Sequence, residues 1–148
     1  MPELGHIVFY VRSLDDSVHF YREVVGLELV GRIFEGRAAM LSGGRTHHEL
    51  LLIEVGEAPA PPAGRRLGLY HVGWKVGESL AELRAARERA EHGGYPVEGM
   101  ADHTVSQSLY LRDPDGNEVE LYIDVQPEKW RDDPTEVLVP TRPLVLGR

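Results

Sequence analysis

The chain has 148 residues, of which 42% are hydrophobic and 27% charged, a balance typical of a single globular domain with a sizeable core. The net charge of -8 argues against a nucleic-acid partner, because phosphate binding needs clustered Lys and Arg. The sequence has no apolar run of membrane-spanning length and no signal-like start, so we expect a cytoplasmic protein without a membrane partner. The chain has no Cys, so a metal site must use His, Asp and Glu.

The first part of the chain predicts a strand, a helix and three further strands. Residues 6–11 alternate as a strand does, and Ser13 is a helix cap with Asp16 as a capping-box-like partner. Gly26 ends this helix. Further strands are expected over residues 27–34, 38–42 and 48–55, followed by a linker rich in Pro, Ala and Gly over residues 56–68.

The same order of elements then returns. Residues 70–76 echo residues 5–11, so that His71 aligns with His6. Ser79 and Glu82 predict a second capped helix. The apolar face of this helix is expected to hold Leu80, Leu83, Ala86 and Ala90, and three strands are expected near residues 97–101, 107–113 and 118–123.

Each half therefore reads as a βαβββ module in an α+β fold. One module cannot cover its own sheet face, so we expect the two to pair as a cupped, partly closed barrel around a metal site. We expect one domain over residues 1–148, composed of module one (1–55), the linker (56–68), module two (69–123) and a C-terminal arm (124–148). Four prolines exclude a long helix in the arm, and its apolar residues indicate an extended segment lying on the domain or on a partner subunit.

The last predicted hairpin places two polar side chains together. Turn residues occupy positions 113–117 between two runs that alternate in polarity. Tyr110 and Glu120 fall on the polar side of these runs, opposite the apolar residues. A carboxylate and a phenol on one strand face are either solvated or part of a site.

Three residues predict a metal site. His6 and His71 occupy equivalent positions at the starts of two strands, opposite the helix-covered face, and Glu120 can enter the same cup. A lone His or Glu at such a position is usually a surface residue, but a His repeated in register favours a site. Two imidazoles and one carboxylate leave open coordination positions, as in non-haem Fe(II) enzymes that bind O₂.

Other histidines have weaker signals. We interpret His47 as a polar loop residue, whereas His48 shares the strand face of Leu50 and Leu52 and could look into the cup. His103 is either an exposed loop residue or a site residue near Tyr110. No role is assigned to His19 and His92, which fall on helices.

Up to about Ile123, the two-module plan resembles the vicinal oxygen chelate superfamily, which includes glyoxalases, fosfomycin-modifying enzymes, epimerases and metal-free drug-binding proteins. Within it, one motif is similar to the signature of type I extradiol ring-cleavage dioxygenases. Ala101 departs from this motif, and many of these dioxygenases carry two such domains in tandem. The matching residues are His103, Leu109, Tyr110, Asp113, Pro114, Gly116 and Glu120.

This resemblance implies an extradiol dioxygenase of the catechol 2,3-dioxygenase type, acting on a catechol-like ring with O₂ in aromatic catabolism. The metal would be Fe(II), with Mn(II) possible, on the three ligands named above. His48 would act as acid and base. Tyr110 would hydrogen-bond a substrate oxygen, and His103 would support that region. Proteins of this fold commonly pair, so a homodimer or higher oligomer is expected.

Two other readings stay open. A glyoxalase- or epimerase-type isomerase or lyase would use a fourth protein ligand, which Glu49 could supply if its strand were shifted by one residue. A drug-binding resistance protein would lack the metal altogether.

Overall fold

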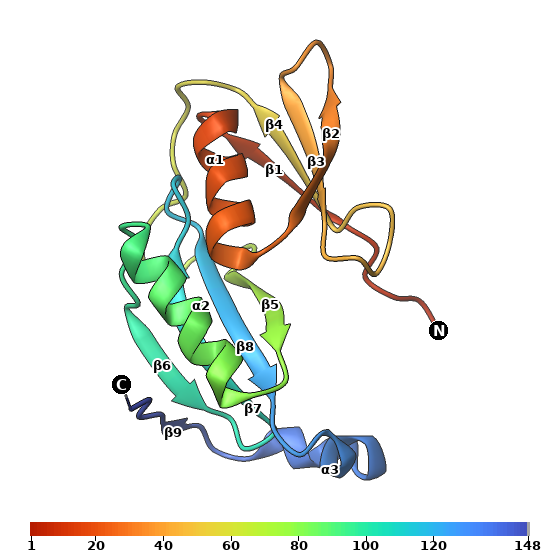
Figure 1. Ribbon diagram of the computed structural model, residues 1–148, viewed down its shortest axis with the longest axis vertical. Helices are drawn as coiled ribbons and strands as arrows, with labels where there is room; N and C mark the ends of the chain where they lie inside the picture. Colours follow the sequence, from red (N-terminus) through yellow and green to blue (C-terminus); the bar gives the residue numbers. More distant parts are fainter. Residues whose placement is uncertain (148) are drawn as a thin grey trace. The chain divides into compact units, whose positions relative to one another are not determined.

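The strands of the computed structural model, which describes residues 1–147, form two separate sheets (Figure 1). The chain divides into two compact units. Unit 1 holds residues 1–63 and 113–116, and unit 2 holds residues 64–112 and 117 onward. Each unit is described by itself below. Within residues 1–147, no helix is long and apolar enough to cross a bilayer.

Unit 1 contains the first βαβββ module. Its sheet has the order β1-β4-β3-β2, in which β1 and β4 are parallel and the other neighbours antiparallel. The elements are β1 (Ile7–Val11), α1 (Leu14–Phe20), the π-helical turn η1 (Tyr21–Val25), β2 (Glu28–Ile33), β3 (Ala38–Ser42) and β4 (Leu50–Glu54).

Helix α1 begins where the sequence predicts, but it ends at Phe20, and η1 continues the helical segment to the predicted stop at Gly26. The Ser13 hydroxyl accepts from the Asp16 N–H, and Gly26 ends η1 with a φ of 98° that suits glycine. Asp16 contributes to this cap through its backbone N–H and not through the carboxylate of a capping box. The carboxylate that accepts from an N–H at the start of the helix is that of Glu54, 2.8 Å from the Leu14 nitrogen. The core of unit 1 lies between α1, η1 and the sheet, and its buried side chains include Leu14, Val18, Phe20, Tyr21, Leu41, Leu50 and Leu52.

Unit 2 contains the second module and the C-terminal arm. Its sheet has the order β5-β8-β7-β6-β9, with β5 and β8 parallel and the other neighbours antiparallel. The elements are β5 (His71–Gly77), α2 (Leu80–His92), β6 (Gly99–Asp102), β7 (Ser106–Arg112), β8 (Glu118–Asp124), α3 (Pro127–Asp132), the 3₁₀ turn η2 (Pro134–Leu138) and β9 (Arg142–Pro143).

Helix α2 packs on β5, β7 and β8. Leu83, Ala86 and Ala90 are buried as predicted. The inclusion of Leu80 in this face is wrong, because this first helical residue is 41% exposed. The sheet residues beneath α2 are Leu109, Leu111, Val119 and Leu121, each at most 1% exposed.

Two details of the predicted fold need correction. The arm is not extended throughout, because α3 and η2 are helical and β9 adds a fifth strand beside β6. Pro127 starts α3, a position at which a missing N–H costs nothing. Across the described residues the strands form two mixed sheets and do not close into a barrel, while the α+β class with two βαβββ modules is confirmed.

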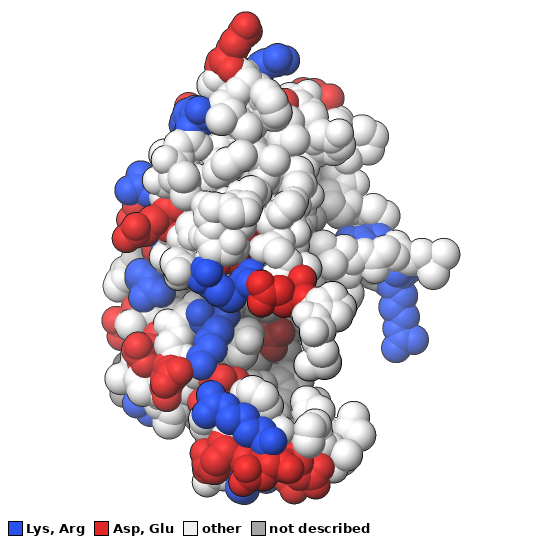
Figure 2. Space-filling view, turned by 90° about the vertical axis from the view of Figure 1, so that its right-hand side faces the viewer, with Lys and Arg blue, Asp and Glu red and all other residues white. Residues whose placement is uncertain are grey.

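The surface carries both signs of charge. Figure 2 shows acidic and basic side chains interspersed along the left and lower parts of the face in view, while its upper centre is largely uncharged. Several of them are paired, including Arg112 with Glu98 at 3.1 Å and Lys75 with Glu78 at 2.8 Å.

Candidate functional site

The polar face of the unit 2 sheet carries most of the candidate site. Strand register places His71 beside Glu118 and Gly73 beside Glu120 across the β5–β8 pair. On the other side of β8, Tyr110 pairs with Glu120. The apolar residues between these positions point into the core beneath α2. The predicted sharing of one face by Tyr110 and Glu120 is therefore confirmed.

His71 lies between two carboxylates. Its Nδ1 is 2.9 Å from Glu118 Oε2, and its Nε2 is 3.2 Å from Glu120 Oε2. Sequence reasoning missed Glu118. The signal was present, because carboxylates two residues apart on a strand lie on the same face.

The second oxygen of Glu120 connects to three further side chains. The Ser108 hydroxyl donates to Glu120 Oε1 at 2.5 Å, and the Tyr110 hydroxyl donates to the same atom at 3.2 Å. The Tyr110 oxygen is also 2.8 Å from His103 Nε2. Burial, reinforced by the charge of Glu120, raises the pKa of Tyr110 to about 12. The phenol therefore stays protonated at neutral pH.

His103 is held from the C-terminal arm. Its Nδ1 is 3.0 Å from the Thr141 hydroxyl, which lies just before β9. The neighbouring turn is fixed by the Asp102 carboxylate, which accepts from the Thr104 N–H at 2.8 Å. No local pattern could have revealed Thr141, because it lies 38 residues from its partner.

Gly73 leaves room beside the Glu120 carboxylate. A Cβ at this position would lie 3.1 Å from Glu120 Oε2 and 3.4 Å from the Tyr122 ring. A side chain there would press on the carboxylate that is the predicted metal ligand, so the absence of a side chain serves the site.

In unit 1, three histidines lie together. His6 is exposed just before β1, and its ring centroid is 4.7 Å from that of His48. The Nδ1 atoms of His47 and His48 are 2.6 Å apart. His48 is only 8% exposed, and burial, reinforced by the neighbouring His47 and His6, lowers its pKa. This favours the neutral imidazole.

The prediction that His48 shares the strand face of Leu50 and Leu52, and so looks into a cup, is wrong. His48 precedes β4, which begins at Leu50, so strand alternation does not place it. The alternate residue Leu52 pairs with Phe9, whose ring centroid is 6.3 Å from that of Tyr21 in η1. That face is therefore the helix-covered one. His48 still lies against His6, through the loop before β4.

Glu49 is engaged within its own loop. Its carboxylate accepts from the Gly43 N–H at 2.8 Å and the Arg45 N–H at 3.1 Å. Burial opposes its ionisation, but these hydrogen bonds, led by that of Gly43, hold the pKa of Glu49 below its ordinary value. Glu49 thus braces the loop between β3 and β4.

The strand register also identifies which residue of module one matches Glu120. Position 8 aligns with position 73 in the repeat, and Val8 pairs with Leu51 as Gly73 pairs with Glu120. Leu51 therefore occupies the position equivalent to Glu120. A glyoxalase- or epimerase-type enzyme would need a carboxylate here as its fourth protein ligand. Module one offers no carboxylate there.

The donor chemistry fits a divalent metal ion. His71 and Glu120 pair an imidazole nitrogen with a carboxylate oxygen, and the other nitrogen of His71 contacts Glu118, as is usual for ligating histidines. His6 belongs to unit 1. Within residues 1–147, no group of three or more His, Asp or Glu side chains is arranged so that it could hold a metal ion.

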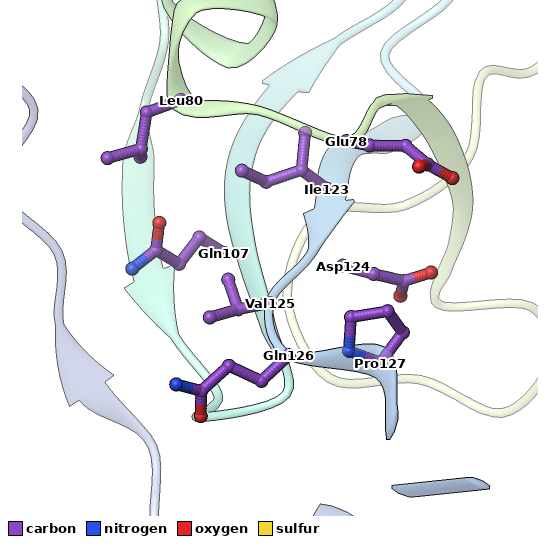
Figure 3. A pocket seen from close by; sticks show the side chains of 8 residues that line it. All are labelled: Glu78, Leu80, Gln107, Ile123, Asp124, Val125, Gln126 and Pro127. Atoms are coloured by element: carbon purple, nitrogen blue, oxygen red, sulfur yellow. The ribbon is translucent and has the colours of Figure 1, made fainter. Parts of the chain in front are cut away.

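A cavity of about 320 Å³ in unit 2 lies near the end of β8, and its described lining contains none of the predicted site residues (Figure 3). Its carboxylates Glu78 and Asp124 both bind Lys75 Nζ at 2.8 Å. Hydrogen bonds to Asp124 and Glu78 raise the pKa of Lys75 to about 12. These charges are satisfied within the protein.

Comparison with known proteins decides the family. The model of the Glyoxalase/Bleomycin resistance protein/Dioxygenase superfamily matches residues 3–121. The chain belongs to this superfamily. The predicted resemblance is confirmed at this level.

Relatives within the superfamily have different chemistries. The chain is 34% identical over 130 residues to a catechol-2,3-dioxygenase of Bacillus subtilis (strain 168), covering 88% of this chain and 44% of the relative. It is 28% identical over 132 residues to a manganese-dependent 2,3-dihydroxybiphenyl 1,2-dioxygenase of Geobacillus genomosp. 3, covering 87% and 39%. The chain thus spans less than half the length of these two curated relatives. A solved lactoylglutathione lyase from Agrobacterium tumefaciens is 30% identical with a TM-score of 0.59, covering 82% and 92%.

Proposed function

We propose that this protein is an extradiol dioxygenase that opens a catechol-like ring with O₂, using Fe(II) or Mn(II). The observation that carries the proposal is one hydrogen-bonded group in unit 2. In it the predicted ligands His71 and Glu120 connect directly to Tyr110 and His103, the two residues that distinguish the dioxygenase signature. The dioxygenase and manganese named for two relatives support the same reading.

The proposed metal ligands are His6, His71 and Glu120. Of these, His71 and Glu120 belong to unit 2 and His6 to unit 1. When bound, the ion would supply Lewis-acid activation of the catechol hydroxyls and a route for electrons toward O₂. The Oε2 atom of Glu120 lies 3.2 Å from the Nε2 atom of His71, so both atoms could bind one ion.

The protein's own residues supply the proton transfers and the substrate contacts. Neutral His48 would accept a proton from a catechol hydroxyl and return it as the ring opens, so the protein gains no net proton. Tyr110 keeps its proton, and on substrate binding its hydroxyl would turn from Glu120 to donate to a substrate oxygen. His103 Nε2 would hold the Tyr110 hydroxyl in place. Both atoms of O₂ end in the product, as the C–C bond beside the two hydroxyl-bearing carbons breaks.

The isomerase or lyase reading is less well supported by the site. Its fourth protein ligand on β4 would fall at the position of Leu51, and the Glu49 carboxylate is occupied by the N–H groups of Gly43 and Arg45. The drug-binding reading leaves the linked polar cluster of unit 2 without a purpose.

We also propose a homodimer or higher oligomer. The C-terminal arm exposes Val137 by 54%, Leu138 by 79% and Val145 by 87%. Apolar side chains this exposed on one segment favour cover by a second copy.

Ring cleavage tests the proposed function directly. Metal-free protein is loaded anaerobically with Fe(II) or Mn(II) and mixed with catechol, 3-methylcatechol or 2,3-dihydroxybiphenyl, and air is then admitted. We expect one O₂ consumed per catechol and a yellow ring-opened product. The matched variant Glu120→Gln should consume no O₂. The absence of O₂ uptake with every catechol, or isomerisation of a hemithioacetal by the Ni(II) or Zn(II) protein without O₂, would overturn the proposal.

A further inference from the structure

We propose that Glu118 is a positioning residue for His71: it accepts a hydrogen bond from Nδ1–H and so leaves Nε2 free to bind a metal ion. The inference rests on the proposed metal site. It concerns a residue that the dioxygenase signature does not contain.

The sheet places Glu118 against the outer nitrogen of His71. The two residues are register partners across β5 and β8, and the Nδ1 to Oε2 distance is 2.9 Å. Glu120 contacts the other nitrogen, Nε2, at 3.2 Å. Because the two nitrogens lie on opposite sides of an imidazole ring, Glu118 cannot share an ion bound by Nε2. Its contact with His71 can only orient the ring and hold its proton.

Glu118 is itself anchored. Its side chain is 11% exposed, and its Oε1 lies 3.6 Å from Arg112 Nη2. Tyr70 also hydrogen-bonds this carboxylate, whose charge and hydrogen bond raise the pKa of the Tyr70 phenol. An acceptor fixed from two sides cannot follow the imidazole if the ring rotates. It therefore restricts His71 to one orientation and one tautomer.

Module one lacks this arrangement. Glu49 is the equivalent of Glu118, since it precedes Leu50, the partner of Ile7, and so falls beside His6. The Glu49 carboxylate is instead occupied by the loop N–H groups of Gly43 and Arg45. Within residues 1–147, a carboxylate thus contacts Nδ1 of His71, and none is found on Nδ1 of His6.

Glu98 provides a matched control. It pairs with Arg112 at 3.1 Å, as Glu118 does on the same guanidinium, and it is half exposed. Glu98→Gln therefore removes the same charge beside the same arginine without changing a contact of His71. Any general effect of charge or of a weakened Arg112 should appear in both Glu118→Gln and Glu98→Gln.

Calorimetric titration with Mn(II) and with Zn(II) measures the first consequence. Outer-shell partners of ligating histidines typically contribute 10- to 100-fold in metal affinity. We expect a loss of about this size in Glu118→Gln, at least as large a loss in Glu118→Leu, and nearly wild-type affinity in Glu98→Gln. Thermal unfolding of each metal-free variant confirms that it is folded.

Nuclear magnetic resonance of the histidine-labelled Zn(II) protein measures the second consequence without any reaction. The Nδ1–H proton of His71 should exchange slowly with water in the wild type and in Glu98→Gln. In Glu118→Leu this resonance should disappear, because the proton has no acceptor. This readout remains usable if Glu118→Gln keeps partial hydrogen bonding through its amide oxygen.

Three results would overturn the inference: unchanged affinity in Glu118→Gln, an equal loss in Glu98→Gln, or a wild-type protein that binds neither ion. The ring-cleavage assay separates this inference from the proposed function. Metal binding that depends on Glu118 in a protein that cleaves no catechol would support the inference and overturn the dioxygenase. Ring cleavage by the wild type, with unchanged metal affinity in Glu118→Gln, would support the dioxygenase and overturn the inference about Glu118.

Discussion

The two modules repeat one backbone plan but treat their leading histidine differently. His71 begins β5 between two carboxylates of the adjacent parallel strand, Glu118 and Glu120. His6 stands exposed before β1 and rests against the ring of His48. The repeat thus supplies a histidine in each module, while the carboxylates that act on it come from only one of them.

The difference originates in three residues of the strand that pairs with each histidine. On β8 the sequence Glu118-Val119-Glu120 places both carboxylates on the polar face. The equivalent residues in module one are Glu49, Leu50 and Leu51, and Glu49 is turned into its loop. Module one therefore offers a histidine and a neighbouring acid-base candidate, whereas module two holds the carboxylates that contact its own histidine.

The largest expected effect comes from removing the carboxylate that only module two has. Glu120→Gln keeps the size of the side chain but removes the charge. We expect metal affinity and ring cleavage to fall by more than the 10- to 100-fold typical of an outer-shell partner. Calorimetry and O₂ uptake measure the two losses. Glu88→Gln on the exposed side of α2 is the control, and an equal effect there would mean that charge alone matters.

Gly73 gives a sharper test of the space around Glu120. In Gly73→Ala the new Cβ would lie 3.1 Å from Glu120 Oε2, so the carboxylate must move. The shift required is a few tenths of an ångström. Since misplacement of a reacting group by about 1 Å can cost 100-fold, we expect activity to fall by up to about tenfold. Gly31→Ala on β2 is the matched control, because its Cβ would meet nothing within 4 Å. Similar kinetics in the two variants would contradict the proposed crowding.

Removal of the Tyr110 hydroxyl tests whether this group connects the proposed metal ligand Glu120 to the substrate. Tyr110→Phe removes the contacts to Glu120 and His103 but keeps the ring. Loss of a hydrogen bond to a charged group costs about 1.5–3 kcal/mol, so kcat/KM should fall about 10- to 100-fold. Tyr10→Phe is the matched control in module one, where we expect little change because Tyr10 is 73% exposed and has no proposed role. Steady-state kinetics on the catechol that gives the highest activity decide between these expectations.

Strand alternation and turn chemistry are enough to predict that Tyr110 and Glu120 share one sheet face. The hairpin around Asp113–Gly116 fixed the register, and register alone places Tyr110 beside Glu120. The contact of Thr141 with His103 could not be foreseen, because it depends on the arm pairing with β6. Alternation cannot place His48, because this residue precedes β4, and its contact with His6 depends on the conformation of the loop before that strand.

Stability should respond to a buried contact in unit 1 between residues that lie far apart in the sequence. The Tyr21 hydroxyl donates to Asp113 Oδ2 at 2.8 Å, and both residues are buried in unit 1. Tyr21→Phe leaves the carboxylate without this donor, so we expect the free energy of unfolding to fall by about 1–3 kcal/mol. Urea denaturation measures this loss. Tyr10→Phe, at a residue 73% exposed, should be neutral, and equal losses in the two variants would contradict the assignment.

The smallest expected effect concerns the helix caps, which also differ between the modules. In α2 the Glu82 carboxylate accepts from the Glu78 N–H and the Ser79 hydroxyl, both at 2.8 Å, whereas α1 uses Glu54 from β4. The hydrogen bond from Glu78 N–H, followed by that from Ser79, lowers the pKa of Glu82 below its ordinary value of 4.5. A carboxyl group whose pKa is lower in the folded state stabilises the fold above its unfolded pKa. This contribution disappears as the pH falls through the folded value.

The wild type should therefore be slightly more stable than Glu82→Gln at neutral pH, and the difference should vanish in acid. Thermal unfolding of both proteins between neutral pH and pH values well below 4.5 measures it. Asp16→Asn in α1 should show no such pH-dependent difference through the cap, because only the Asp16 backbone serves Ser13. A gap between wild type and Glu82→Gln that persists in acid would mean that the side chain acts by packing rather than by its charge.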